Sequence, residues 1–232
     1  MALVSEFKEA LLHLFFPHVC PGCYSDLVSQ EQLICPQCMQ SLPFTEFESM
    51  PGNPVEKLFW GRSVVQHASS IFYFIPDTPL QHIIHHIKYK NNPALGAYMG
   101  SIMGSRFKQL YSIQHIDLMI PMPLHAKKEY ERGYNQASLL CKGISDVVHI
   151  PWRDDVLIRQ FHTSTQTKKS RIERWKNVSD VFALHAPSAI ANKHILLIDD
   201  VITTGASMDA CAAMLLAKKA ASVSICSLAY TI

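Results

Sequence analysis

The feature that most constrains this fold is a continuous segment near the end of the chain, residues 195–207. It opens with four aliphatic residues that predict a buried β-strand: Ile195, Leu196, Leu197 and Ile198. Asp199 and Asp200 follow, and two adjacent carboxylates at the end of a buried strand are costly to desolvate unless they meet hydroxyl groups or a cation. Small and hydroxyl-bearing residues then predict a turn into a helix: Thr203, Thr204, Gly205, Ala206 and Ser207.

A ribose phosphate satisfies each group in this segment. The vicinal hydroxyls of a ribose can donate hydrogen bonds to Asp199 and Asp200. Free backbone N–H groups of the turn and the positive end of the helix dipole can hold a phosphate dianion, and Gly205 lets the backbone approach it closely. We therefore predict that Asp199 and Asp200 are a catalytic acid pair and that the five turn residues bind a ribose 5-phosphate group.

Strands and helices alternate along most of the chain. Apolar patterns predict one or two strands over residues 63–75 and single strands over residues 117–120, 156–158 and 223–229. One helix is predicted to start at a capping box formed by Thr78, Pro79 and Gln81. Others are predicted to end near residue 110 and to cover residues 136–148 and 207–218. This alternation predicts an α/β fold with a largely parallel, twisted sheet flanked by helices.

The first 50 residues carry a separate motif, two C-x-x-C pairs with eleven residues between them. This spacing predicts a tetrahedral thiolate site for Zn²⁺ in a small zinc-ribbon module, with Cys20, Cys23, Cys35 and Cys38 as ligands. Four sulfur ligands leave no open position, so the metal would be structural. Free thiols, a disulfide, a redox C-x-x-C pair, or His18 in place of one cysteine are the alternatives. A short amphipathic helix is predicted before Pro17, and a Pro- and Gly-containing linker at residues 50–54 predicts a module at residues 1–50 and a domain at residues 51–232.

Composition restricts the partners and the compartment. The formal net charge of +2 argues neither for nor against a polyanionic partner. Residues 1–50 hold one Lys against six acidic residues, whereas residues 159–176 hold six basic residues against Glu173. No apolar run approaches the roughly 18 residues needed to cross a bilayer, and no signal peptide is predicted. We expect a cytoplasmic protein without membrane insertion, in a reducing compartment where clustered cysteines more often bind metal.

Further motifs resemble those of one family. The sequences P-M-P-L-H at residues 121–125 and R-G-Y-N-Q at residues 132–136 resemble signatures of the ComF/GntX family, which are type I phosphoribosyltransferase-like proteins. The cysteine pairs, Lys88 with Tyr89, and a series from Arg159 to Phe182 resemble the same family. The resemblance implies binding of 5-phosphoribosyl 1-pyrophosphate, with the acid pair on the ribose and the turn on the 5-phosphate.

The resemblance also implies a pyrophosphate side, after the strand at residues 117–120. The residues there that supply positive charge and backbone room are Lys127, Lys128, Arg132 and Gly133. A Mg²⁺ ion would be held by water and by the ligand's own oxygens. This chain has Lys128 and Tyr130 where the family usually has more arginine. An ordinary solvated basic loop is the alternative.

Two functions remain open at the level of sequence. One is a Mg²⁺-dependent phosphoribosyltransferase with a hood at about residues 60–92 and an acceptor that the sequence does not name. The other, implied by the resemblance, is a non-catalytic competence protein that aids uptake or handling of single-stranded DNA, with DNA or a DNA-uptake helicase as its partner. The basic residues 159–176 fit a flap over the pyrophosphate, a nucleic-acid surface or a plain solvated loop.

Overall fold

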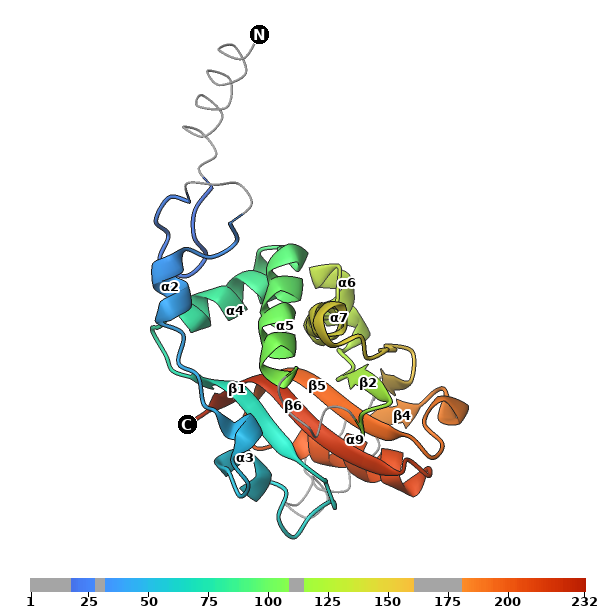
Figure 1. The fold of residues 1–232 in the computed structure, drawn as a ribbon. Coiled ribbons are helices and arrows are strands. Elements are labelled where there is room, and N and C mark those ends of the chain that lie inside the picture. Colours follow the sequence, from blue (N-terminus) through green and yellow to red (C-terminus); the bar gives the residue numbers. More distant parts are fainter. Residues whose placement is uncertain (1–17, 28–31, 109–114, 161–180) are drawn as a thin grey trace, which may run out of the picture.

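Figure 1 shows the fold as a computed structural model, which describes residues 18–27, 32–108, 115–160 and 181–232. The helix predicted before Pro17 and residues 161–176 of the predicted flap lie outside the described residues. Within the described ranges, no helix is both long enough and apolar enough to span a bilayer.

A four-stranded parallel sheet forms the centre of the fold. Its strands lie in the order β1 (Ala68–Phe74), β6 (Ser222–Thr231), β5 (His194–Ile202) and β2 (Leu118–Pro121). Because neighbouring strands run in the same direction, the carboxyl ends of β5 and β2 lie at one edge of the sheet, where α/β proteins usually bind ligands. The predicted α/β fold with a largely parallel sheet is confirmed.

Helices cover both faces of the sheet (Figure 1). One face carries α4 (Pro79–Tyr89), α5 (Pro93–Phe107) and α7 (Gln136–Val148), and the other carries α9 (Ala206–Ala217). Strand β5 contributes to both cores, because its side chains alternate between the faces. Leu196 and Ile198 pack in the core that contains α5 and α7, whereas Ile195 and Leu197 pack in the core that contains α9.

Helices α5 and α7 approach each other closely through glycines. A Cβ atom added to Gly143 would overlap the carbonyl oxygen of Ala97, and one added to Gly100 would overlap the carbonyl oxygen of Leu140. Side chains are therefore excluded from both positions, and the two helices pack backbone to backbone. This contact fixes α7, whose first turn lies at the carboxyl edge of the sheet.

Short elements connect the cysteine segment to the sheet: α2 (Pro36–Gln40), the 3₁₀ helix η1 (Phe47–Ser49) and α3 (Pro54–Lys57). The backbone N–H of Thr45 donates to the carbonyl of Ile71 at 3.0 Å, and the N–H of Tyr73 donates to the carbonyl of Pro43 at 2.9 Å. The chain before the predicted boundary at residue 50 thus runs beside β1. The division of the chain at residue 50 stays a prediction.

The strand predicted at residues 156–158 is displaced from the main sheet. Strand β3 (Leu157–Arg159) pairs antiparallel with β4 (Phe182–Leu184) in a separate two-stranded sheet, which the 3₁₀ helix η3 (Pro187–Ala189) follows. In β3 only Leu157 is buried, whereas a strand inside a parallel sheet is buried on both faces. The short apolar pattern was correct for a strand but wrong for its place in the alternation.

Two more elements differ from the expectation near the carboxyl edge. Strand β5 does not end at Ile198, because β6 continues beside it and pairs Ile202 with Tyr230. Asp199 and Asp200 therefore lie within the last part of the strand rather than after it. The segment after β2, treated as a basic loop, instead forms the short helix α6 (Ala126–Arg132).

The predicted capping box of α4 does not form as expected. The hydroxyl of Thr78 donates to the carbonyl of Ile75 at 2.7 Å, and the Gln81 side chain accepts from the N–H of Asp77 at 2.7 Å. Neither side chain makes the reciprocal bonds of a capping box. The helix nevertheless begins at Pro79, as predicted.

Candidate functional site

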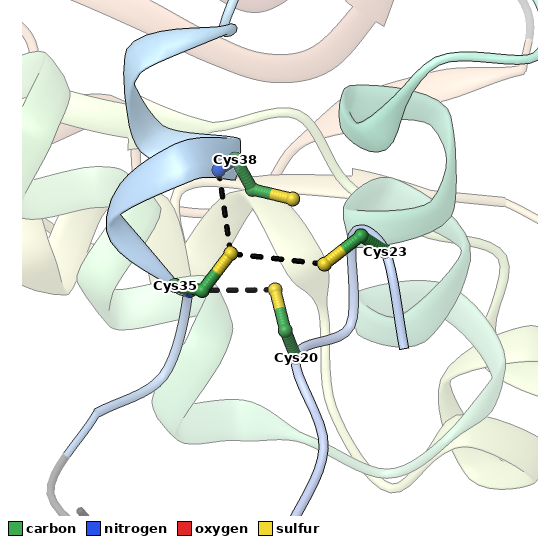
Figure 2. A group of neighbouring side chains, drawn as sticks. All are labelled: Cys20, Cys23, Cys35 and Cys38. Atoms are coloured by element: carbon green, nitrogen blue, oxygen red, sulfur yellow. Dashed lines mark hydrogen bonds between the residues drawn. The ribbon is translucent and has the colours of Figure 1, made fainter. Parts of the chain in front are cut away.

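The four cysteines of the two C-x-x-C pairs meet at one centre (Figure 2). Their sulfur atoms all lie within 4.8 Å of one another, and the Sγ atoms of Cys23 and Cys35 are 3.7 Å apart. A tetrahedral Zn²⁺ with Zn–S bonds of about 2.3 Å separates its sulfurs by about 3.8 Å. The cluster therefore fits the predicted metal module.

Hydrogen bonds from the backbone also suit thiolate ligands. The N–H of Cys35 donates to Sγ of Cys20 at 3.3 Å, and the N–H of Cys38 donates to Sγ of Cys35 at 3.3 Å. Burial raises the pKa of Cys38, whereas hydrogen bonding with Ser25 lowers the pKa of Cys23 to about 6. The two pKa values thus shift in opposite directions, and a bound cation would favour the thiolate form of both side chains.

The cysteine cluster packs against helix α4. Nδ1 of His82 lies 2.8 Å from the carbonyl oxygen of Gly22, and the ring of Tyr24 contacts the rings of His82 and His86. Nε2 of His18 lies 2.8 Å from the carbonyl oxygen of Gln32, and His18 is not part of the cluster. The alternative in which His18 replaces a cysteine ligand therefore finds no support in the geometry.

The acid pair lies at the other candidate site, near the end of β5. Asp200 forms an ion pair with Lys88 at 2.9 Å and accepts the N–H of Val201 at 2.6 Å. Asp199 accepts the N–H of Asp200 at 2.8 Å. Burial, and next the charge of Asp200, raise the pKa of Asp199 from its ordinary value of 3.8 to about 7. Asp199 therefore titrates near neutral pH, beside the ion pair between Asp200 and Lys88.

The predicted phosphate turn connects β5 to α9. Gly205 has φ +71° and precedes the first residue of α9, whose start lacks a side-chain cap. A Cβ atom at Gly205 would lie 3.1 Å from the ring of Phe59, so this position requires glycine for two reasons. Arg62 donates to the carbonyl of Thr204 at 3.1 Å, which ties the turn to the segment after α3. The uncapped N–H groups of α9 make this turn a suitable anion site.

A cavity of about 180 Å³ joins the acid pair to the start of α9 and to α6. Its charged residues are four cations and two carboxylates: Lys88, Lys128, Arg132, Arg159, Asp199 and Asp200. Ser207, Asn135 and Gln136 also line it. An excess of positive charge beside an acid pair suits a ligand that carries both hydroxyl groups and phosphates.

The predicted pyrophosphate residues divide between the two sides of α6. Lys128 and Arg132 are four residues apart, so they share one helix face, and both line the cavity. Lys127 does not line it and lies 4.0 Å from Glu131, on another face. Gly133 ends α6 with φ +78°. The geometry brings Lys128 and Arg132 to the acid pair and leaves Lys127 outside.

Sequence reasoning did not assign Lys88, Asn135 or Gln136 to the site, and it offered Arg159 only as the first residue of a possible flap. Asn135 caps α7 and donates to the carbonyl of Met122 at 2.9 Å, and Gln136 accepts from Arg132 at 2.6 Å. These residues all occur in the motifs that resemble the ComF/GntX family, and this was the signal that could have found them. A second cavity of about 250 Å³ adjoins the first and shares Lys88, Lys128 and Arg132 with it.

Comparisons with known proteins identify one matching domain family, several related proteins and some similar solved structures. The phosphoribosyl transferase domain family matches residues 135–231. The DNA utilization protein YhgH of Escherichia coli (strain K12) is 28% identical over 218 residues, which cover 92% of this chain and 91% of that protein. A glutamine phosphoribosylpyrophosphate amidotransferase from B. subtilis, a solved structure, matches 62% of this chain and 30% of its own with 16% identity and a TM-score of 0.44.

The similarity to a third protein is close enough to decide the family. The competence protein ComFC of Bacillus subtilis (strain 168) is 30% identical over 207 residues, which cover 89% of this chain and 81% of that protein. This similarity covers more than twice the length matched by the phosphoribosyl transferase domain family. The motifs that resemble ComF/GntX signatures and this similarity agree, and this chain belongs to the ComF family.

Proposed function

We propose that the cleft binds 5-phosphoribosyl 1-pyrophosphate and that the protein is a Mg²⁺-dependent phosphoribosyltransferase. One observation carries the proposal: a single cavity is lined by the acid pair, by Ser207 at the start of α9 and by four cationic side chains. A ribose with phosphates at both ends presents hydroxyls in its middle and negative charge on either side. The cavity thus contains the three kinds of group that such a ligand would contact.

Each part of the ligand has a proposed partner. Asp199 and Asp200 accept hydrogen bonds from the ribose hydroxyls, and the turn from Thr203 to Ser207 holds the 5-phosphate at the uncapped start of α9. Lys128 and Arg132 hold the pyrophosphate. Mg²⁺ enters with the ligand and is bound by phosphate oxygens and water.

The proposed reaction transfers the phosphoribosyl group to an acceptor. A nitrogen of the acceptor forms a bond to C1 of the ribose, while the bond from C1 to the pyrophosphate oxygen breaks and the electron pair leaves with pyrophosphate. Cations in the cleft stabilise the departing charge, and the acid pair holds the sugar in position. The acceptor would lie beneath the hood at about residues 60–92.

The remaining assignments belong to the same proposal. Zn²⁺ is the metal of the four-cysteine cluster, because four sulfur ligands in tetrahedral arrangement suit it best. It is structural, in a module at residues 1–50 that precedes the domain at residues 51–232. A reducing cytoplasm is the compartment in which such a cluster remains available to a metal.

Calorimetric titration tests the ligand, and a base panel tests the reaction. We expect phosphoribosyl pyrophosphate to bind with an affinity that increases when Mg²⁺ is present. Incubation of the complex with purine, pyrimidine and pyridine bases should then release pyrophosphate with at least one of them. A protein that does not bind phosphoribosyl pyrophosphate with or without Mg²⁺ contradicts the proposal.

A second candidate is a non-catalytic role in the handling of single-stranded DNA. It is favoured by the similar proteins, which are named DNA utilization protein and competence protein. Ligand binding without pyrophosphate release across the panel would favour this role. Fluorescence anisotropy of labelled single-stranded DNA at several salt concentrations measures it directly, and Lys168→Ala with Lys169→Ala tests the basic stretch. Binding that the double variant does not weaken would leave the zinc module or a helicase partner as the route to DNA.

A further inference from the structure

Lys88 occupies an unusual place, at the last turn of α4 and in contact with the acid pair. Its Nζ atom lies 2.9 Å from Oδ2 of Asp200, and the two side chains are 23% and 18% exposed. The other oxygen of that carboxylate accepts the N–H of Val201. In the free protein, both oxygens of Asp200 are therefore already engaged.

Ribose binding conflicts with this arrangement. A hydroxyl group that donates to Oδ2 of Asp200 must share that oxygen with the ammonium group or replace it. A half-buried ammonium group that has lost its anionic partner destabilises the complex. The ligand that displaces Lys88 from Asp200 must therefore offer it another anion nearby.

The pyrophosphate side of the cleft is where such an anion would arrive. Lys88 lines both the acid-pair cavity and the adjoining cavity, and in both it is accompanied by Lys128 and Arg132. A lysine has four methylene groups, so its ammonium can change partner while its backbone stays in place. Glu131 also lines the adjoining cavity, so Lys88 raises the balance there from two cations against one carboxylate to three against one.

Packing and a hydrogen bond fix the backbone at Lys88, so that its side chain alone can exchange Asp200 for the pyrophosphate. Leu80, Ile83, Ile84 and Ile87 form the buried face of α4. The hydroxyl of Tyr134 donates to the carbonyl of Ile87 at 2.7 Å, next to Lys88 and within the segment that leads into α7. Only the side chain of Lys88 has to move when a ligand enters.

We propose that Lys88 is a ligand-binding residue that moves from Asp200 to the pyrophosphate when the ribose hydroxyls bind to the acid pair. Lys88 then makes the cleft selective, because ribose 5-phosphate must displace the ammonium group without giving it a new anion. Phosphoribosyl pyrophosphate supplies that anion. This inference rests on the proposed function of the cleft and adds a residue that discriminates between two ligands of the same site.

The test is the ratio of two affinities. Calorimetry should measure phosphoribosyl pyrophosphate and ribose 5-phosphate, each with Mg²⁺, against the wild-type protein, Lys88→Met and Lys88→Arg. We expect Lys88→Met to weaken the binding of phosphoribosyl pyrophosphate by about 10- to 100-fold, which is the effect of losing one charge-assisted hydrogen bond. Ribose 5-phosphate should change by less than about threefold, because the lost competition for Asp200 offsets any lost attraction. Lys88→Arg should keep most of the selectivity.

Lys90→Met is the matched control, because Lys90 is exposed, caps the same helix and does not line either cavity. It should leave both affinities within about twofold. Equal losses of affinity for the two ligands in Lys88→Met would overturn the inference. The ion pair between Lys88 and Asp200 would then have only a structural role. If Lys88→Met does not fold, Lys88→Gln gives the same ratio. Wild-type protein that binds neither ligand overturns the proposed function, and this inference with it.

Discussion

The four-cysteine cluster and the acid-pair cleft both gather acidic groups, but they compensate them differently. All four ligands of the cluster lie within residues 20–38, and the cluster itself contains no cationic side chain. The cleft draws its charged residues from α4, α6, β3 and β5, and its two acids share the cavity with Lys88, Lys128, Arg132 and Arg159. In the proposed function, the cluster takes a cation from outside, whereas the cleft already contains cations and takes an anionic ligand. Loss of the metal should therefore affect folding, and loss of the cleft's acids should affect binding.

Metal removal should give the largest effect. Cys38→Ser removes a buried ligand, so we expect the bound zinc to fall from one ion per chain to none. The free energy of unfolding should decrease by about 3 kcal/mol or more, because the binding energy of a structural zinc is also folding energy. Elemental analysis and chemical denaturation with and without a chelator measure the two quantities. Cys211→Ala, a buried cysteine outside the cluster, should keep its zinc. One zinc per chain in Cys38→Ser would contradict the assignment.

The acid pair should show the opposite separation of effects. Asp199→Asn combined with Asp200→Asn should weaken the binding of phosphoribosyl pyrophosphate by about 100-fold or more, since each hydrogen bond to a charged group contributes about 1.5–3 kcal/mol. Calorimetry measures the affinity, and elemental analysis should still find one zinc per chain. Unchanged ligand affinity in a folded double variant would remove the acid pair from the site. A loss of zinc would show that the two regions are not independent.

Ionisation of Asp199 in the cleft should lower the free energy of unfolding. Its pKa is raised from 3.8 to about 7, so between these pH values the folded protein binds more protons than the unfolded chain. Stability must then fall as the pH rises through this window and become level above it. Asp199→Asn cannot ionise, so it should raise the free energy of unfolding at pH 8 by about 1–3 kcal/mol and flatten the pH dependence. Denaturant titrations at pH 5 and pH 8 measure this. An equal loss of stability at both pH values would contradict the raised pKa.

The contrast also explains what could be predicted from the sequence. The cysteine ligands and the acid pair are contiguous motifs, so their chemistry is visible before folding. Lys88 and Asp200 are brought together only by the packing of α4 against the carboxyl edge of the sheet, and no local pattern reports that contact. The position of β3 likewise depends on its pairing with β4, which the apolar pattern of three residues does not contain.

Helix α6 is a different case, because its sequence contains local signals for a helix. His125 caps its start, Lys127 and Glu131 are spaced as an i, i+4 pair, and Gly133 ends it with a positive φ. Interpreting the segment as a loop gave all of its cations equal access to the ligand. In the helix, Lys128 and Arg132 lie on the face toward the cleft and Lys127 lies on another face. The comparison of Lys127 with Lys128 therefore gives a small but specific prediction.

Lys128→Ala should weaken the binding of phosphoribosyl pyrophosphate by about fivefold, because Lys128 lines the cleft but is exposed to solvent. Lys127→Ala should change the affinity by less than about twofold, since that side chain lines neither cavity and lies beside Glu131. The two variants remove the same charge from neighbouring positions of one short helix, so long-range electrostatics affect them almost equally. Calorimetry at two salt concentrations separates a direct contact from that general attraction, because the latter weakens in both variants alike. Equal effects of the two substitutions would mean that the ligand senses only the net charge of α6, and the pyrophosphate would then have to be held chiefly by Lys88, Arg132 and Arg159.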